Sequence, residues 1–383
     1  MMPRRKRLLV VQPYVPAYRV ALFEQLRQAL AAREIDLHLA VGVTPPELEA
    51  RRDSRGQGIA DEQLAEWSIR LGGSTLRYRR LDSLLGRLQP DLVIVEQAIK
   101  NLELYGLLLR RSLHSSYRLG LWGHGLPHPR NQPAAKSRLR MAITRRADWF
   151  FAYTQAGADY VVQHGVRRDR VTVLNNTIDT AALGRELALV TERDLSEFNA
   201  RLGLSPGITA LFLGGVDQHK GVDFLVAAAG EIRRQLPGFV LLIGGRGGLE
   251  ARVQAAQEAG APIRFLGRLD DASKALALTS CSILCIPEWV GLVAVDSCVA
   301  GRPIVTTVHP NHAPEFEYLR DGENAILVPH EIGAYAAAVS DLLSDGRRLS
   351  ALQAGAVASA EGMMIEAMVE RFVAGIESWV RTT

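Results

Sequence analysis

Short apolar runs alternate along the chain with segments of helical periodicity, and this alternation constrains the fold more than any other feature. The first run, Leu8–Val11, precedes leucines at i, i+4 and i+8 within Ala21–Arg33, the spacing of one helix face. Repeated strand, helix and strand predicts a parallel sheet covered by helices on both faces. Further expected strands are 35–43, 92–95, 118–122, 149–153, 171–174, 210–213, 240–243, 263–266, 282–286 and 303–306.

The length of 383 residues suits two or three domains. A polar stretch, 192–207, separates two series of alternating elements, so we expect two doubly wound domains joined near 177–207. The first would span residues 1–180 and the second 181–360, with a tail helix over 361–383 that ends in Trp379. Other expected helices are 223–235, 249–259, 271–278 and 294–300.

Composition excludes several classes of protein. The longest stretch without a charged residue, Leu202–Val216, has 15 residues, whereas a membrane-spanning helix needs about 20 mostly apolar ones. The basic start is followed by a strand-like run rather than by the apolar region of a signal peptide. Three cysteines, Cys281, Cys285 and Cys298, are too few for a disulfide framework. We therefore expect a cytoplasmic protein.

Charge is distributed unevenly between the two halves. Residues 1–180 hold 28 Lys and Arg against 17 Asp and Glu, a net charge of +11, and residues 181–383 hold 17 against 24, a net charge of −7. A basic first half suggests an anionic partner: nucleic acid, an acidic lipid surface or a phosphorylated substrate. The alternative is a solvated arginine-rich face. Arg138, Arg140, Arg145 and Arg146 are candidates for lipid contact, which would place the protein at the inner face of a membrane.

Glycine-rich loops follow three expected strands of the second half. Doubly wound sheets bind ligands at the carboxyl ends of their strands, where these loops lie. Gly214 and Gly215 let a backbone approach a phosphate, and Lys220 can reach the same anion. The loop is not a Walker P-loop, because Gly-Lys-Ser/Thr is absent. The other two loops are Gly244–Gly248, with Arg246, and Gly267-Arg268.

Two carboxylates eight residues apart follow a later strand. Glu288 leaves the expected strand 282–286, and Asp296 lies about two turns into the next helix. Between them Val290, Gly291 and Leu292 would form the helix N-terminus, where free N–H groups attract a phosphate. One carboxylate could hold sugar hydroxyls and the other a ribose, so the segment favours a nucleotide-sugar ligand.

Residues 208–345 resemble the nucleotide-binding domain of retaining glycosyltransferases of family 4, also called glycosyl transferases group 1. The segments that carry the resemblance occur in the family's order and spacing. The first half resembles the family more loosely, through Trp122-Gly123-His124-Gly125 and Val173–Asp179. The matching segments are Gly214-Gly215…Lys220-Gly221, Ile243–Arg246, Phe265–Gly267, Glu288-x7-Asp296, Ala300–Val305 and Asp321–Asn324.

The resemblance implies the GT-B fold: two Rossmann-like domains that face a central cleft, with the C-terminal helix crossing back to the first domain. It implies a metal-independent enzyme without a cofactor. Such an enzyme moves a hexose from a UDP- or GDP-sugar to a hydroxyl of a glycan, lipid-linked or small-molecule acceptor. The implied partners are thus a nucleotide-sugar and its acceptor, not nucleic acid, with peripheral contact to an anionic membrane as a further expectation.

The resemblance also implies residue roles. Lys220 would clamp the donor diphosphate, Glu288 would hold sugar hydroxyls, and His124 would face the donor sugar. The backbone amides of Val290, Gly291 and Leu292 would contact the sugar and the β-phosphate. Asp296 would contact the ribose. The nucleotide base would be bounded by the loops that contain Gly244, Arg246, Gly267 and Arg268.

The chain departs from the family pattern at several positions. Gly215 stands where the family has an arginine beside the phosphate, and Arg246 is a candidate to replace that charge. Asp296 is shorter than the usual glutamate. The first strand leads into a Pro…Tyr-Arg segment rather than a glycine-rich loop, which makes Tyr18 and Arg19 the acceptor-side candidates.

Other interpretations stay open. Gly215 allows a catalytically lapsed sugar-nucleotide-binding subunit of a glycosylation complex. A nicotinamide-dependent oxidoreductase is weakly supported, because no Gly-x-Gly-x-x-Gly follows the first strand. His309-x2-His312 resembles a metal pair, but zinc needs three or four ligands, so we expect no metal site. Cys281-x3-Cys285 is interpreted as structural.

Overall fold

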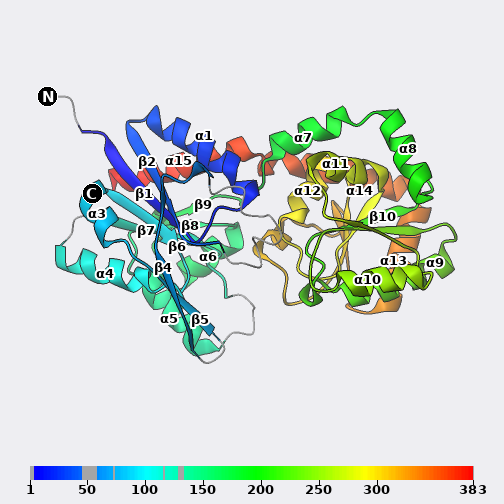
Figure 1. The fold of residues 1–383 in the computed structure, drawn as a ribbon, viewed down its shortest axis with the longest axis horizontal. Coiled ribbons are helices and arrows are strands. Elements are labelled where there is room, and N and C mark those ends of the chain that lie inside the picture. Colours follow the sequence, from blue (N-terminus) through cyan, green and yellow to red (C-terminus); the bar gives the residue numbers. More distant parts are fainter. Residues whose placement is uncertain (1–3, 45–57, 72–73, 115–116, 128–132, 383) are drawn as a thin grey trace. The chain divides into compact units, whose positions relative to one another are not determined.

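The alternating apolar runs form two parallel sheets, each covered by helices (Figure 1). The structure is a computed structural model that describes residues 4–44, 58–71, 74–114, 117–127 and 133–382. Residues 1–3 of the basic start lie outside that range. The chain divides into two compact units: unit 1 is Met1–Asp179 with Ile365–Thr383, and unit 2 is Thr180–Met364.

The sheet of unit 1 has the strand order β3-β2-β1-β6-β7-β8-β9, and all neighbours are parallel. Strand order reverses between β1 and β6, the kind of position where doubly wound sheets bind ligands. The strands are β1 (Lys6–Gln12), β2 (Ile35–Val41), β3 (Glu62–Gln63), β6 (Leu92–Glu96), β7 (Arg118–Gly123), β8 (Trp149–Ala152) and β9 (Val171–Val173).

Alternation along β1 builds two cores, one on each face of this sheet. Leu8 and Val10 pack on the side of α1 and α15, whereas Leu9 and Val11 belong to the core on the other face. The helices of unit 1 are α1 (Val20–Ala31), α3 (Asp82–Leu88), α4 (Glu103–His114), α5 (Ala134–Thr144), α6 (Gln155–Gln163) and α15 (Ile365–Arg381).

Helix α15 completes the core of unit 1, which confirms the expected return of the tail helix to the first domain. Its Phe372 ring stacks on Phe151 with 4.7 Å between centroids and meets Trp122 edge-on at 5.1 Å. Trp379 is fully buried and lies so close to Gly120 that a Cβ there would be 3.0 Å from the indole ring. The last helix is therefore part of the first unit's interior.

Unit 2 has a sheet in the order β12-β11-β10-β13-β14-β15, again with parallel neighbours. Its strands are β10 (Thr209–Leu213), β11 (Val240–Gly244), β12 (Ile263–Gly267), β13 (Ile283–Cys285), β14 (Ile304–Thr307) and β15 (Ala325–Val328). Its helices are α7 (Thr180–Leu189), α8 (Glu192–Leu202), α9 (Val222–Gln235), α10 (Glu250–Glu258), α11 (Asp271–Ser280), α12 (Val293–Ala300), α13 (Ile332–Ser344) and α14 (Gly346–Ala360).

The chain passes from unit 1 to unit 2 at Asp179 and Thr180, within the expected stretch 177–207, but the polar part of that stretch is helical. Thr191 caps α8: its hydroxyl accepts the Asp194 N–H at 3.1 Å, and the Asp194 carboxylate accepts the Thr191 N–H at 3.2 Å. Helices α7 and α8 both pack against α11. The high polarity reflects a helix with one narrow buried stripe, of which Phe198 is the buried residue.

Four of the described strands were not expected from the sequence, among them the short β3 at the edge of the unit 1 sheet. β15 adds an edge to the unit 2 sheet, and β4 (Glu66–Leu71) pairs with β5 (Ser74–Arg79) as a separate antiparallel hairpin in unit 1. Among the described residues, no helix combines the length and apolar character that crossing a bilayer requires.

The packing of α15 predicts a stability effect. Phe372→Ala should lower the free energy of unfolding of unit 1 by about 3–5 kcal/mol, because it leaves a cavity among buried aromatic rings. Urea unfolding followed by tryptophan fluorescence measures this, and Leu189→Ala, at an exposed position of α7, is the control. A Phe372→Ala protein as stable as the control would contradict the assignment of α15 to the core.

Candidate functional site

The three glycine-rich loops of unit 2 are joined by backbone hydrogen bonds at the carboxyl ends of β10, β11 and β12. The Gly214 N–H donates to the Gly244 carbonyl at 3.0 Å, and the Gly245 N–H donates to the Gly267 carbonyl at 2.7 Å. The Val216 N–H donates to the Arg246 carbonyl at 2.9 Å. The loops therefore form one continuous rim, as the strand-end rule predicts.

Glycine is required where these loops touch. Gly245 has a φ of +144°, and a Cβ at this position would lie 1.7 Å from the Gly214 carbonyl oxygen. A Cβ at Gly247 would lie 2.3 Å from the Val216 carbonyl oxygen. Both of these oxygens belong to the backbone, so they cannot move away by a change of rotamer as a side chain could. Arg246 and Arg268 are exposed on the same rim.

Lys220 and Glu288, predicted to share the site, lie beside each other in the structure. The Lys220 ammonium donates to the carbonyl of Trp289 at 3.0 Å. Gly221, in the left-handed region at φ +67°, leaves room for the Glu288 side chain: a Cβ there would be 2.9 Å from its Oε1. A residue larger than glycine at 221 would thus press on the carboxylate.

The loop after Glu288 differs in one respect from the sequence-based expectation. The Val290 amide was expected to contact a donor, but Val290 is fully buried and its N–H donates to His312 Nδ1 at 3.0 Å. His312 Nε2 in turn lies 2.8 Å from the Thr307 carbonyl, so Nδ1 is the accepting nitrogen. The predicted amides of Gly291 and Leu292 directly precede α12.

Trp289 holds this loop in an uncommon conformation. Its φ of +50° lies in the left-handed region, which a bulky residue rarely adopts and which costs on the order of 1–3 kcal/mol. Such strain persists only where the surroundings hold it, and here the indole lies edge-on to His219 with centroids 4.9 Å apart.

Asp296, the second predicted carboxylate, is buried in the first turn of α12. Its Oδ1 pairs with the Lys274 ammonium of α11 at 2.5 Å. The side chain of Asp296 is therefore held by a partly exposed lysine from the neighbouring helix. Sequence reasoning missed Lys274, since nothing in the helix that carries it marks the residue. The expected contact of Asp296 with a ribose stays a prediction.

Two histidines that sequence reasoning did not assign to the site flank Glu288. His330 Nε2 lies 3.5 Å from Glu288 Oε1, and His309 Nε2 lies 3.9 Å from Oε2. They follow neighbouring strands, β14 and β15, and the His330 ring stacks on Phe224 with 4.6 Å between centroids. The sequence suggested a pair of His309 with His312. The strand-end rule would have found His330 had β15 been expected.

Glu288, His309 and His330 have the composition of a metal site, and their ligand atoms lie within 4.8 Å of one another. The hydrogen bonds favour another arrangement. His309 Nδ1 accepts the Asn311 N–H at 3.3 Å, so the proton of the neutral ring sits on Nε2, the nitrogen that faces Glu288. In this tautomer Nε2 cannot ligate a metal, and at 3.9 Å from Glu288 Oε2 it makes a polar contact longer than a hydrogen bond.

In unit 1, His124 lies just after β7 in a cluster of aromatic and charged groups. Its ring meets Tyr153 with centroids 4.6 Å apart. Arg19 donates to the Tyr153 hydroxyl at 2.8 Å and to the Gln12 side chain at 3.0 Å, and its guanidinium lies 4.5 Å from the Trp122 ring centre. Burial raises the pKa of Tyr153 to about 12, although Arg19 opposes the shift, so the phenol stays neutral.

The acceptor-side candidates and the cysteines differ in exposure. Arg19 is buried, whereas Tyr18 beside it is exposed. All three cysteines are buried and free, and burial raises the pKa of each thiol to about 12, which supports their structural interpretation. Arg138, Arg145 and Arg146 are exposed, but Arg140 turns inward to the Leu126 carbonyl at 3.2 Å, so the four do not form one exposed face.

Two family models match the chain, one in each half. Residues 21–182 match Glycosyltransferase Family 4, and residues 207–345 match Glycosyl transferases group 1. A phosphatidyl-myo-inositol mannosyltransferase of Mycolicibacterium smegmatis is 38% identical over 162 residues, 40% of this chain and 40% of the relative. A D-inositol 3-phosphate glycosyltransferase of Nocardia farcinica is 30% identical over 247 residues, 60% of this chain and 52% of the relative. The alignments thus span about half of these relatives or less.

Solved structures share the fold across the whole chain. Anabaena HepE, in complex with UDP, superposes with a TM-score of 0.72 at 16% identity, covering 97% of this chain and 100% of that one. A sucrose-phosphate synthase of Thermosynechococcus elongatus gives a TM-score of 0.68 at 17% identity, covering 99% and 100%. These likenesses confirm the expected GT-B architecture. With a family model in each half, the chain belongs to the family 4, or group 1, glycosyltransferases.

Proposed function

We propose that the protein is a retaining glycosyltransferase that moves a hexose from a UDP- or GDP-sugar to a hydroxyl of a glycan, lipid-linked or small-molecule acceptor. The observation that carries the proposal is the meeting of Lys220 with the Glu288 loop beside the rim of glycine loops. The cation and the close-packed backbone suit the diphosphate of a donor, and the carboxylate suits its sugar. All three lie at the ends of adjacent strands.

The donor would lie with its diphosphate beside Gly214 and Gly215. Lys220 would exchange its bond to the Trp289 carbonyl for the diphosphate and stabilise the charge that develops on it during transfer. Glu288, oriented by His309 and His330, would accept hydrogen bonds from sugar hydroxyls. Asp296, paired with Lys274, would accept a hydrogen bond from the ribose.

The acceptor would be bound by unit 1 through the exposed Tyr18, with Arg19 buried beside it as a supporting residue and with His124 at the donor sugar. The two relatives reported above are named for phosphatidyl-myo-inositol and inositol 3-phosphate, which favours a phosphate-bearing polyol among the acceptors to be tried first. HepE has been solved with UDP-glucose, so a UDP-hexose belongs in the same donor panel.

A lapsed, sugar-nucleotide-binding subunit is the second candidate, because Gly215 removes one cation that the family places beside the phosphate. Transfer and donor-hydrolysis assays separate the two. Turnover of any donor supports the enzyme, whereas tight donor binding without turnover across the panel supports the lapsed subunit.

Glu288→Ala should reduce transfer by roughly 100-fold, the scale of losing one preorganised group of a site. Binding of the free nucleoside diphosphate should change little, since the carboxylate is assigned to the sugar. Steady-state kinetics and calorimetry measure both, with Glu258→Ala at an exposed position of α10 as the control. Near-normal transfer by a stably folded Glu288→Ala protein would refute the assignment.

Lys220→Ala should weaken binding of the nucleoside diphosphate but leave the nucleoside as before, because the ammonium is assigned to the phosphates. Calorimetry with both ligands is the measurement, and Arg347→Ala, at an exposed position of α14, controls for a general loss of positive charge. An equal loss for both ligands would argue against a phosphate contact.

Transfer should proceed unchanged in excess EDTA, because the proposal assigns the charge on the leaving group to Lys220 and to backbone N–H groups. Assays in EDTA, and then with added Mg²⁺, Mn²⁺ or Zn²⁺, test this. Activity that disappears in EDTA and returns with one metal would show that Glu288, His309 and His330, or another group, bind an essential ion.

A further inference from the structure

The hairpin of β4 and β5 carries an apolar face that the described residues of unit 1 leave largely exposed. Its register pairs Trp67 with Tyr78 and Ile69 with Leu76, and places Leu71 opposite Ser74. Because side chains alternate along a strand, Trp67, Ile69, Leu71, Leu76 and Tyr78 share one face. Trp67 is 51% exposed, Ile69 62%, Leu71 67% and Tyr78 36%.

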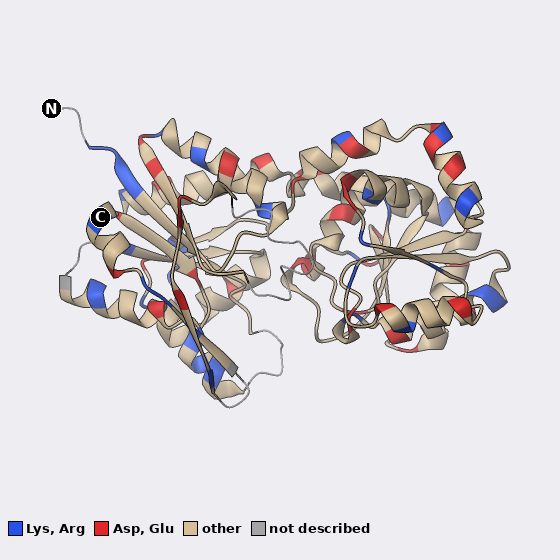
Figure 2. Ribbon diagram, viewed as in Figure 1, with Lys and Arg blue, Asp and Glu red and all other residues tan. Residues whose placement is uncertain are grey.

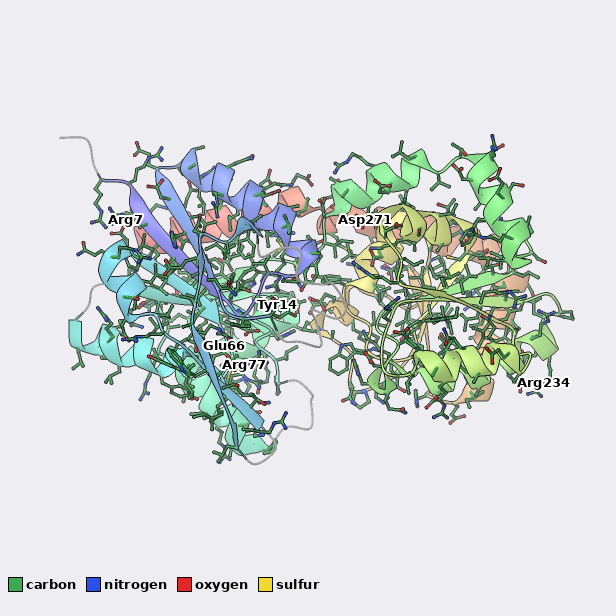
Figure 3. The ribbon with its side chains drawn as sticks, in the orientation of Figure 1. Arg7, Tyr14, Glu66, Arg77, Arg234 and Asp271 are labelled. Atoms are coloured by element: carbon green, nitrogen blue, oxygen red, sulfur yellow. The ribbon has the colours of Figure 1, made fainter. Side chains whose placement is uncertain are left out.

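The base of the hairpin is held firmly, so its projection is a built feature of unit 1. Arg79 is buried between Glu66, 2.8 Å from its Nε, and Glu103, which its Nη1 also contacts. The Arg77 N–H donates to the Lys100 carbonyl at 2.9 Å, and the Leu102 N–H donates to the Arg77 carbonyl at 2.7 Å. Figure 3 labels Glu66 and Arg77, whose side chains lie 3.7 Å apart near this base.

An exposed apolar face on a two-stranded ribbon marks an interaction surface, because such a ribbon gains little stability alone. The order of side chains identifies the partner. The aromatic pair, Trp67 and Tyr78, lies next to the anchored base, and the aliphatic residues lie beyond it. At about 3.3 Å per residue, Ile69 lies roughly 7 Å and Leu71 roughly 13 Å past Trp67. A bilayer surface has the same order, with aromatic side chains favoured at the headgroups and aliphatic ones below.

The charges of the hairpin fit an anionic surface. Arg70 and Arg80 are exposed, and the described part of the chain includes no ion pair for either. The carboxylates on and just before the hairpin are already engaged, Asp61 by Arg27, Glu62 by Arg87 and Glu66 by Arg79. Figure 2 shows the Lys and Arg positions of unit 1, whose sequence up to residue 180 has a net charge of +11. Arginine side chains can reach lipid phosphates while their stems cover apolar surface.

We propose that the β4–β5 hairpin docks unit 1 on an anionic phospholipid bilayer by inserting the face formed by Trp67, Ile69, Leu71, Leu76 and Tyr78. The proposal goes beyond the transfer reaction and does not depend on it. It identifies a docking element other than the arginines near α5.

Vesicle sedimentation tests the docking with the full chain. Binding should be weak to phosphatidylcholine vesicles, stronger when part of the lipid is phosphatidylglycerol, and reduced by salt. Ile69→Ser with Leu71→Ser should lower the partition coefficient at least about tenfold, because each buried CH₂ adds to membrane affinity. The matched control is Leu109→Ser with Leu113→Ser, which removes two leucines that are 63% and 68% exposed on α4.

Trp67 supplies a readout through the difference between the wild-type and Trp67→Phe proteins, because the tryptophans at 122, 149 and 379 are buried and Trp289, in unit 2, is half-buried. Its emission should shift to the blue with anionic vesicles and be quenched by brominated lipid, and Trp67→Phe should remove both signals. Thermal unfolding without lipid verifies that each variant is folded. Equal binding by the hairpin and control variants, or an unchanged Trp67 signal on bound vesicles, would overturn the proposal. So would lipid-independent self-association that only the hairpin variant abolishes, which would identify a second copy as the partner.

Discussion

The candidate site depends on how closely two backbone segments approach each other. The Gly214 carbonyl lies where a side chain on residue 245 would begin, and the hydrogen bonds from Gly214 and Gly245 tie three loops into one rim. Gly221 serves the same purpose against Glu288, by leaving space that a Cβ would fill. In this site glycine supplies close contact between fixed groups. Phosphate recognition by backbone N–H groups needs such a surface, because any Cβ would hold the anion away.

Sequence alone predicted much of this arrangement, because parallel strands are marked by apolar runs and ligand loops follow their ends. The loops at Gly214, Gly244 and Gly267, and the neighbouring Lys220 and Glu288, lie where the strand-end rule placed them. The hydrogen bond from the Val290 N–H to His312 Nδ1 was not predictable, because His312 lies 22 residues along the chain and its tautomer is not visible in the sequence. His330 was missed with its strand, since the short apolar run Ala325–Val328 was not included among the expected strands.

The remaining errors share a physical origin in surface polarity. The polar segment 192–207 was expected to be part of the linker near 177–207, although a capping box at Thr191 and Asp194 begins a helix there. The hairpin had the opposite character: Trp67, Ile69 and Leu71 alternate with polar residues as a half-buried strand does, yet this face is exposed. Pattern indicates which residues share a face. It does not indicate what covers that face, and at the hairpin that difference concerns function.

Helix α15 has a consequence for how the chain is made. Unit 1 is the first to leave a ribosome, but Phe372 and Trp379, which fill its core against Trp122, Phe151 and Gly120, are synthesised only after all of unit 2. At 5–20 residues per second, the wait between Asp179 and Ile365 is roughly 10 to 40 s. During that interval one face of the first sheet lacks its last helix, so the nascent chain carries an open aromatic surface while its second unit is already able to fold. Translation speed and chaperone access therefore bear on this protein mainly through its final helix.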